Sequence, residues 1–202
     1  MFSAMACEVL SKGAPQGTSL TVFRKCDRLP KSDVERRREV NNRISQLFVV
    51  TLHTTMQIFP CPSESRSKQL LTECGLTTKD LQSSHFENFL GWGSTATDTR
   101  GIVGLEFFGN VALLRSLAVT REARGLGGGK ALVQEAESYA RHKGVRKLFL
   151  LTITAQRFFE ALGYTIIERT AAPEPIKGTP EFSTLCPASA VLMVKELESL
   201  QE

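Results

Sequence analysis

The pattern of apolar and polar residues divides the chain into an N-terminal stretch and a longer region of alternating strands and helices. Residues 1–31 carry Gly, Pro, Ser and Thr without periodicity, which is typical of poorly ordered chain. Residues 32–55 place apolar side chains at a loosely helical spacing. We therefore predict a partly disordered or helical extension over residues 1–55 and a folded domain over residues 56–198.

From residue 56 onward, short apolar runs typical of strands alternate with amphipathic stretches typical of helices. Gly109-Asn110 is a two-residue hairpin signal between two of the strands. A long proline-containing connection over residues 170–187 precedes the last strand. The pattern predicts strands at 56–60, 89–92, 101–108, 111–119, 145–153, 164–168 and 189–195, and helices at 63–73, 78–86, 128–143 and 155–162.

Composition and charge restrict the class of protein. The chain has 202 residues, of which 42% are hydrophobic, enough for one domain of ordinary size and an appendage. No apolar run approaches the roughly 18 residues of a membrane span. The net charge of +4 lies entirely in residues 1–55, which indicates either a segment that binds an anionic partner or a solvated helix face. Because the remainder has no basic excess, we predict neither a nucleic-acid nor a membrane partner.

The cysteines and histidines indicate no metal site. The five cysteines are scattered, odd in number and include no C-x-x-C pair, and the three histidines stand alone. Free thiols are typical of a reducing compartment, so we predict a cytoplasmic protein.

The run from Arg124 to Lys130 is the most informative motif. Its four glycines follow an apolar strand and precede an amphipathic helix, and backbone N–H groups at such a helix start bind anions. A Walker loop would need glycine at position 124 and Ser or Thr at position 131, which hold Arg and Ala. A dinucleotide-binding loop would need a third glycine at position 130. The loop is therefore neither a Walker loop nor a dinucleotide-binding loop. Its glycines still indicate a diphosphate site of another kind.

The pattern that fits is Arg-x-x-Gly-x-Gly, formed by Arg124, Gly127 and Gly129, which resembles the pyrophosphate loop of the GNAT superfamily of acetyl-CoA-dependent N-acetyltransferases. The order of the predicted elements resembles the same fold from about residue 56 to residue 197. The resemblance implies an α/β (α+β) domain with a central, mixed, mostly antiparallel sheet of about seven strands flanked by helices. Longer strings resemble the N-acetyltransferases encoded in bacterial arsenic-resistance operons, and these strings begin at Gly104, Ala112, Leu150, Phe158 and Glu181.

The resemblance implies acetyl-CoA as the cosubstrate and no metal. In this family the strand before the loop splays from its parallel neighbour, and one of its unpaired N–H groups stabilises the oxyanion of the tetrahedral intermediate. The diphosphate would lie on the loop, with added positive charge from Arg124 and Lys130. By position, the resemblance assigns cofactor binding to Leu117, Ala118, Val119, Arg124, Gly125, Leu126, Gly127, Gly128, Gly129, Lys130, Thr152 and Phe158.

Attack by a neutral amine on a thioester needs a group that takes up a proton. Glu106 is the candidate base, directly or through water, and an ion pair with Arg115 is the alternative interpretation. The tyrosine that often serves as the acid in this family is replaced by Phe159. A proton would then come from water or from a hydroxyl such as Ser116 or Thr152, or would not be needed.

Three further residues need an explanation. Arg115 interrupts an apolar strand, so it needs either a substrate carboxylate or Glu106 as its partner. Cys186 either lines the acceptor pocket or is a buried, inert thiol. Gly128 holds a position usually occupied by Leu or Ile in the resembling family, and consecutive glycines cost the helix start roughly 0.5–1 kcal/mol each. We therefore expect the cofactor to order this loop.

These observations predict an acetyl-CoA-dependent N-acetyltransferase that acts on a small primary amine, amino-acid-like or related to arsenic resistance, by direct attack in a ternary complex. One alternative is a GNAT-fold module that binds acyl-CoA without catalysis, which Phe159 favours. Another is a protein N-acetyltransferase that uses the basic extension to engage an acidic partner. The sequence leaves open whether the protein forms a homodimer.

Overall fold

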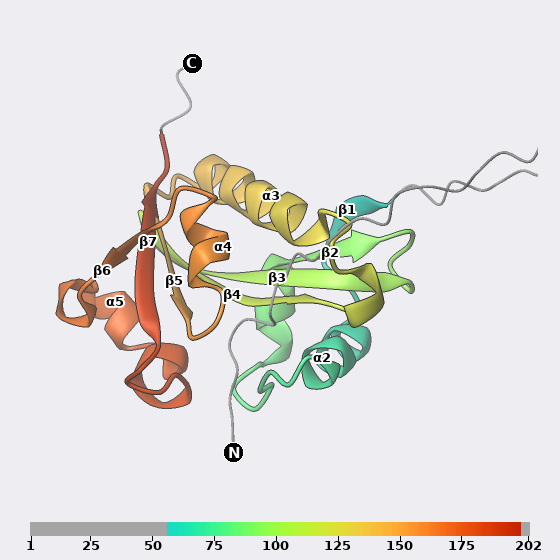
Figure 1. Ribbon diagram of the computed structural model, residues 1–202, viewed down its shortest axis with the longest axis horizontal. Coiled ribbons are helices and arrows are strands. Elements are labelled where there is room, and N and C mark those ends of the chain that lie inside the picture. The colour runs from blue at the N-terminus through green and yellow to red at the C-terminus, as the bar shows by residue number, and fades with distance from the viewer. Residues whose placement is uncertain (1–55, 199–202) are drawn as a thin grey trace, which may run out of the picture. The chain divides into compact units, whose positions relative to one another are not determined.

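A computed structural model describes residues 56–198, which form a seven-stranded sheet with helices on both faces (Figure 1). The strand order is β1-β2-β3-β4-β5-β7-β6, and every neighbouring pair is antiparallel except β4 and β5. The predicted fold class is therefore confirmed. The helix and the basic extension predicted before residue 56 lie outside the described residues. The strands are β1 (Gln57–Pro60), β2 (Phe89–Gly93), β3 (Thr99–Phe108), β4 (Val111–Val119), β5 (Lys147–Thr152), β6 (Thr165–Ile167) and β7 (Val191–Glu196).

One prediction about the helices is wrong in detail. In place of the helix expected over residues 78–86, a 3₁₀ helix forms at η1 (Ser83–Asn88), because the His85 ring accepts the backbone N–H of Gln82 at 3.2 Å and fixes the start there. No helix was predicted in the long connection, where Pro175 fits the first turn of a short helix. The other helices form where the apolar pattern of the sequence predicted them. The helices and turns are α2 (Glu64–Glu73), η2 (Arg121–Ala123), α3 (Gly128–His142), α4 (Gln156–Glu160), η3 (Arg169–Ala171), α5 (Glu174–Lys177) and η4 (Glu181–Leu185).

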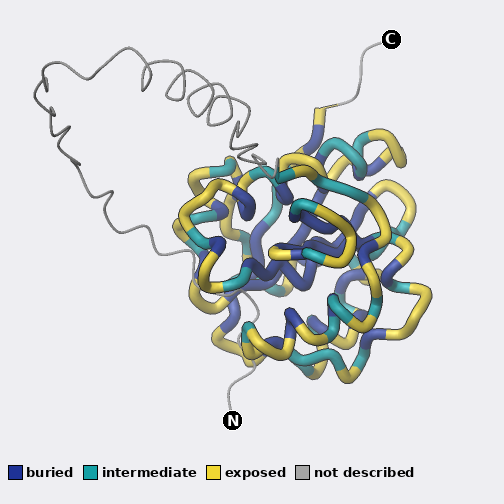
Figure 2. The backbone as a smooth tube through the Cα atoms, turned by 90° about the vertical axis from the view of Figure 1, so that its right-hand side faces the viewer, coloured by how far each residue is buried: buried dark blue, intermediate teal, exposed yellow. Residues whose placement is uncertain are grey.

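Strand β4 is buried on both faces of the sheet, which explains its nearly unbroken apolar run (Figure 2). On one face, α3 and α4 cover a core cluster that contains Leu114. On the other face, one cluster forms under α2 and a second, containing Leu113, forms under α5. Because side chains alternate along a strand, Arg115 shares this second face with Leu113. There Asp80, from the turn after α2, and Glu181, from η4, both reach it.

The structure explains why residue 128 is glycine. A Cβ atom at Gly128 would overlap the ring of Trp92, a buried side chain of β2 that packs under the start of α3. A Cβ atom at Gly129 would instead lie 3.7 Å from Phe158, which is an ordinary van der Waals contact. The two neighbouring glycines therefore differ in kind, since only the first makes room for a core side chain.

This difference predicts opposite effects of two alanine substitutions. Gly128→Ala forces the Trp92 ring to move, and we expect a loss of about 1–3 kcal/mol in the free energy of unfolding. Gly129→Ala reduces the freedom of the unfolded chain without a clash, and we expect a gain of about 0.5–1 kcal/mol. Urea denaturation of the two variants measures both. Equal effects of the two substitutions would contradict the packing account.

Candidate functional site

The sheet opens between its two parallel strands. The pairing of β4 with β5 runs from Val111 and Lys147 to Leu113 and Phe149, and then stops. β4 continues to Val119 and β5 to Thr152, so the second half of β4 is paired only with β3. An open parallel edge carries backbone N–H and C=O groups that face away from β3. A ligand with amide groups can pair with such an edge as a strand would.

A β-bulge interrupts β4 within the opening. Gly104 pairs with Arg115 and Ile102 with Ala118, so Val103 alone faces two residues of β4. One of the two is Ser116, whose φ of 56° lies in the left-handed region. The extra residue shifts the alternation by one, and Leu117 joins the same core cluster as Leu114. The bulge therefore turns backbone groups of β4 away from the ordinary ladder within the opening.

The glycine loop closes one end of the opening. It follows β4 through η2, and Gly127 caps α3 in the left-handed conformation, with a φ of 85°. Leu126 projects into solvent with 63% of its surface exposed. The Arg124 Nε donates a hydrogen bond to the Val119 carbonyl at 3.3 Å, which ties the loop to the end of β4. The N-terminal N–H groups of a fifteen-residue helix thus face the end of the splayed strand.

Strand β5 and helix α4 line the other side of the opening. The Thr152 hydroxyl accepts the backbone N–H of Ala155 at 3.0 Å and thereby supports the turn into α4. Phe158 of α4 lies beside Gly129, at the start of α3. The residues predicted to bind the cofactor are therefore brought together from β4, β5, α3 and α4.

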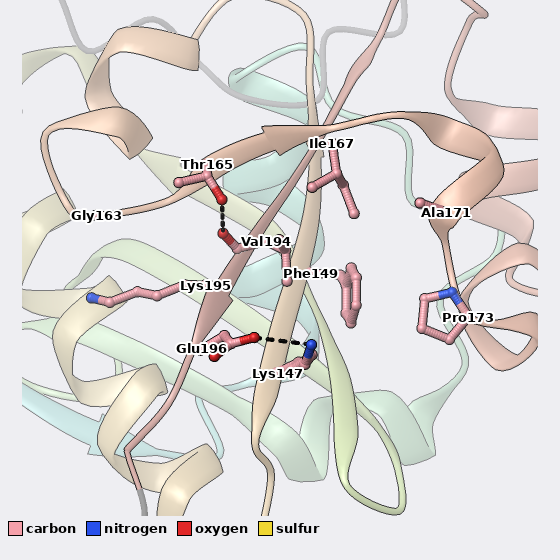
Figure 3. Close-up of a pocket in the computed structure, with 10 residues that line it drawn as sticks. All are labelled: Lys147, Phe149, Gly163, Thr165, Ile167, Ala171, Pro173, Val194, Lys195 and Glu196. Carbon is pink, nitrogen blue, oxygen red and sulfur yellow. Dashed lines mark hydrogen bonds and ion pairs between the residues drawn. The ribbon is translucent and has the colours of Figure 1, made fainter.

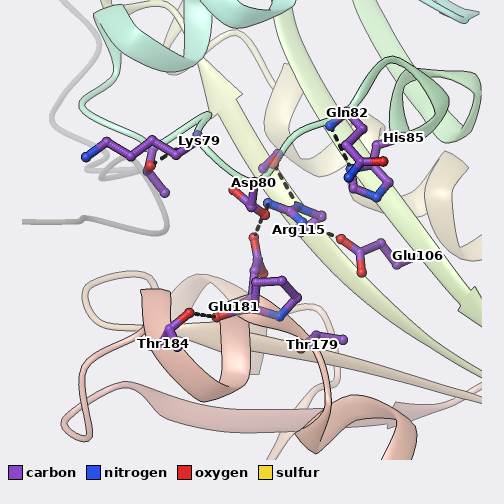
Figure 4. Close-up of polar contacts among 12 residues, drawn as sticks. Lys79, Asp80, Gln82, His85, Glu106, Arg115, Thr179, Glu181 and Thr184 are labelled. Atoms are coloured by element: carbon purple, nitrogen blue, oxygen red, sulfur yellow. Dashed lines mark hydrogen bonds and ion pairs between the residues drawn. The ribbon is translucent and has the colours of Figure 1, made fainter.

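A buried charge cluster lies next to the bulge, on the face of the sheet opposite α3 (Figure 4). Arg115, with 1% of its side chain exposed, forms ion pairs with Asp80 at 2.5 Å, with Glu181 at 2.9 Å, and with Glu106. Its Nε also donates to the Ser116 hydroxyl at 3.3 Å. The structure thus contains the Glu106–Arg115 pair that the sequence offered as an alternative to a base.

Sequence reasoning missed Asp80 and Glu181. The available signal was Arg115 itself, because one charge in an apolar strand needs counter-charges. The residues that supply them stand in the turn after α2 and in the connection before β7, and neither segment is near β4 in the sequence.

Three carboxylates around one guanidinium leave the cluster with an excess of negative charge. Burial raises the pKa of Glu181 to about 8, and the carboxylates of Glu106 and Asp80 add to this rise while Arg115 opposes it. Burial alone would lower the pKa of Arg115, but its three carboxylate partners raise that pKa above its ordinary value. In the folded chain the cluster therefore holds a proton on Glu181 at neutral pH.

This proton makes stability depend on pH. Between the ordinary carboxyl pKa and about pH 8 the folded chain binds a proton that the unfolded chain has lost, so the free energy of unfolding falls as the pH rises. We expect Glu181→Gln to remove a slope of at most about 1.4 kcal/mol per pH unit. Urea denaturation across this interval measures it. Glu174→Gln, at an exposed residue of α5, should keep the slope, and an unchanged slope in Glu181→Gln would contradict the assignment.

The structure places three other residues of interest in the core. Cys186 belongs to the cluster under α5, and burial raises the pKa of its thiol to about 12, which disfavours a thiolate. Phe159 is buried and contacts the rings of Phe158 and Tyr164 edge to face. Tyr164 is buried as well, as expected for a core residue, and burial raises its pKa well above the ordinary value.

A second hollow lies at the other edge of the sheet, over β5, β6 and β7 (Figure 3). Its volume is about 690 Å³, and Lys147 pairs with Glu196 at its rim at 3.0 Å. It lies over strands that are hydrogen-bonded to β7, and none of the candidate catalytic residues lines it. The opening beside the glycine loop is therefore the better candidate site.

Residues 56–198 contain no helix that is both long and apolar enough to cross a membrane. Within that range, no group of three or more His, Cys, Asp or Glu side chains is arranged to hold a metal ion.

Comparison with known proteins agrees with this geometry. An uncharacterized N-acetyltransferase of Chlorobaculum tepidum is 41% identical over 66 residues, which make up 33% of this chain and 42% of that protein. The chain thus matches less than half the length of this relative.

Two solved structures share the fold. N-acetylglutamate synthase from Neisseria gonorrhoeae, complexed with coenzyme A and N-acetyl-glutamate, has a TM-score of 0.61 at 19% identity, over 71% of this chain and 35% of that one. A Mycobacterium tuberculosis protein crystallised with CoA has a TM-score of 0.59 at 21% identity, over 71% and 99% of the two chains. The model of the acetyltransferase (GNAT) family matches residues 58–164, more than half of the sequence. The chain therefore belongs to the acetyltransferase (GNAT) family.

Proposed function

We propose that the domain over residues 56–198 is an N-acetyltransferase that moves an acetyl group from acetyl-CoA to a small primary amine. The observation that carries the proposal is the opening between β4 and β5, which ends at the glycine loop. A pantetheine arm carries amides that can pair with the open edge of β4, and a diphosphate fits the N–H groups at the start of α3. The two solved neighbours, both crystallised with CoA, support the same ligand.

In the proposed binding mode, Leu117, Ala118 and Val119 pair with the pantetheine amides, and Arg124 and Lys130 add positive charge near the diphosphate. The remaining cofactor contacts follow the loop, with Thr152 and Phe158 on the far side of the opening. A backbone N–H at the bulge donates to the thioester oxygen and to the oxyanion that forms from it.

The proposed reaction is direct transfer in a ternary complex. The amine nitrogen attacks the thioester carbon, the C–S bond breaks, and CoA leaves as its thiolate. Glu106, with 13% of its side chain exposed beside Arg115, takes the proton that the amine loses, directly or through one water. Because Phe159 has no hydroxyl, the thiolate leaves unprotonated or takes a proton from Ser116, Thr152 or water. The buried, weakly acidic thiol of Cys186 argues against an acetyl-enzyme intermediate.

The acceptor and the cellular context are further parts of the proposal. The strings shared with arsenic-resistance acetyltransferases suggest an amino-acid-like amine, and the N-acetyl-glutamate in the Neisseria neighbour is an N-acetylated amine of that class. Arg115 already has three carboxylate partners, so a substrate carboxylate would have to displace one of them. The scattered cysteines favour a reducing compartment, and we keep the cytoplasm as the proposed location.

The test is turnover. Purified full-length chain is incubated with acetyl-CoA and a panel of small primary amines that includes amino acids, and free CoA thiol is measured over time. We expect thiol release that depends on at least one amine. Tight CoA binding without release for any amine would instead indicate a non-catalytic acyl-CoA module. Release with protein substrates alone, lost on deletion of residues 1–55, would indicate a protein acetyltransferase.

A further inference from the structure

Two carboxylates of the charge cluster meet at a single nitrogen. Asp80 and Glu181 both accept from the Arg115 Nη2, at 2.5 and 2.9 Å. Each uses one oxygen for that contact. The other oxygens, Asp80 Oδ1 and Glu181 Oε2, are buried and have no hydrogen-bond partner among the described residues. The side chains are 9% and 4% exposed. A buried carboxylate oxygen without a donor is costly, so this pair is incomplete without a further donor.

A small cavity adjoins Glu181, which carries one of the two unpartnered oxygens. It has a volume of about 10 Å³ and is lined by Leu76, Thr77, Ser116 and Glu181. That volume matches the roughly 10–15 Å³ that one water-sized group needs, and an ammonium group has that size. Ser116 is the residue of the β-bulge, so the cavity lies beside the part of β4 that faces the proposed thioester.

The charge of the cluster selects the kind of group that the cavity can take. Asp80, Glu106 and Glu181 face one guanidinium, so an anion is excluded and a neutral donor leaves the negative charge uncompensated. A proton on Glu181 removes one of the two excess negative charges in the free protein. A primary ammonium group can replace that proton, because it carries one positive charge and three N–H donors.

We infer that this cavity is the subsite for the ammonium group of the acceptor, held by the free oxygen of Glu181. The inference rests on the proposed function for the identity of the acceptor, and it narrows the acceptor class. Amines that are cationic in solution bind, whereas alcohols lack the charge, and quaternary ammonium ions lack the N–H donors and are too large. Before attack, the bound ammonium group gives one proton back to Glu181 and becomes a neutral amine, and Glu106 takes the second proton as the amide forms. Glu181 thereby becomes a residue that determines specificity.

The test uses methylammonium as the probe on the full chain saturated with CoA, near the pH of about 8 at which Glu181 titrates. Sodium chloride is replaced by methylammonium chloride at constant ionic strength, and the thermal unfolding midpoint is recorded. Ligand that binds the folded state raises the midpoint, and we expect a rise of at least about 2 °C. Tetramethylammonium chloride and methanol serve as probes of size and charge, and neither should raise it.

Three variants test which carboxylates are needed for the rise in the unfolding midpoint. Glu181→Gln keeps the shape of the cluster but removes the charge that lines the cavity, and it should abolish the rise. Asp80→Asn removes a charge of the same cluster that does not line the cavity, and it should reduce the rise. Glu137→Gln neutralises a carboxylate that is equally buried but paired with Lys195 at 2.7 Å, and it should keep the rise. CoA affinity should be the same in all three variants. An equal rise in Glu181→Gln and the parent, or an equal rise with tetramethylammonium, would overturn the subsite.

Turnover measurements distinguish a failure of this inference from a failure of the proposed function. With an amine that is acetylated, we expect Glu181→Gln to raise the KM for the amine at least tenfold and to change kcat less. Turnover with an unchanged amine KM in the variant would overturn the subsite and leave the acetyltransferase standing. A methylammonium effect that depends on Glu181, without turnover of any amine, would keep the subsite and overturn the proposed reaction.

Discussion

Replacement of Arg115 by methionine is expected to cost about 3–5 kcal/mol of the free energy of unfolding, because it leaves Asp80, Glu106 and Glu181 buried without their counter-charge. Methionine keeps much of the length of the side chain, so lost packing contributes little. Urea denaturation of the variant and the parent, at a pH near 8 where Glu181 begins to ionise, measures the loss. The loss should shrink as the pH falls, since protonation of Glu181 removes one of the charges that Arg115 compensates.

The matched control is Arg100→Met. Arg100 pairs with Asp98 at 3.2 Å on the surface, where both side chains are more than two-fifths exposed. Surface pairs contribute about 0–1 kcal/mol, so this variant should lose no more than that. The double variant Arg115→Met with Glu181→Gln has one buried, unpaired carboxylate fewer than Arg115→Met. It should therefore recover part of the lost free energy of unfolding. Equal losses in Arg115→Met and Arg100→Met would show that the cluster does not hold the two segments on β4.

Replacement of Glu106 by glutamine is expected to lower kcat by about 10²–10⁴-fold, the range over which a positioned base accelerates proton transfer. Glutamine keeps an oxygen that can accept from Arg115 but cannot take a proton from the amine. The measurement is steady-state release of CoA thiol with the best amine of the panel. The KM for the amine should change little, because the ammonium group binds Glu181 in our account.

A control separates a base from a structural partner. Glu135→Gln removes a carboxylate from the exposed face of α3 and should leave kcat unchanged. Full activity in Glu106→Gln, together with reduced stability, would show that the residue serves only the ion pair with Arg115.

The strands and the main helices could be predicted because their signals are local. β4 is an apolar run because it is buried on both faces, and α3 shows one apolar stripe because one side packs on the sheet. No helix was predicted in the connection before β7. Its helices α5 and η4 are too short for a periodic pattern, and tertiary contacts such as Ile176 in the core stabilise them.

The candidate site was predictable only in part. The glycine loop lies within one short stretch of sequence, and so its anion-binding geometry could be inferred from spacing. The reason for glycine at position 128 lies in Trp92, and the partners of Arg115 lie in two segments distant from β4. Packing and ion pairs of this kind join positions that no local pattern connects. From the sequence, Arg115 was predicted to have one carboxylate partner, either Glu106 or a substrate. In the structure, three carboxylates of the protein pair with it.

The central claim is that the acetyl group passes directly from acetyl-CoA to an amine bound beside the bulge of β4. Mass spectrometry of the full chain and of the small molecules, after incubation with acetyl-CoA with and without amine, follows that group most directly. The account predicts N-acetylated amine in proportion to released CoA, no acetylated protein when amine is omitted, and a loss of product in Glu106→Gln. Acetyl-CoA that stays intact with every amine while bound to the protein, or an acetyl group on Cys186, would contradict it.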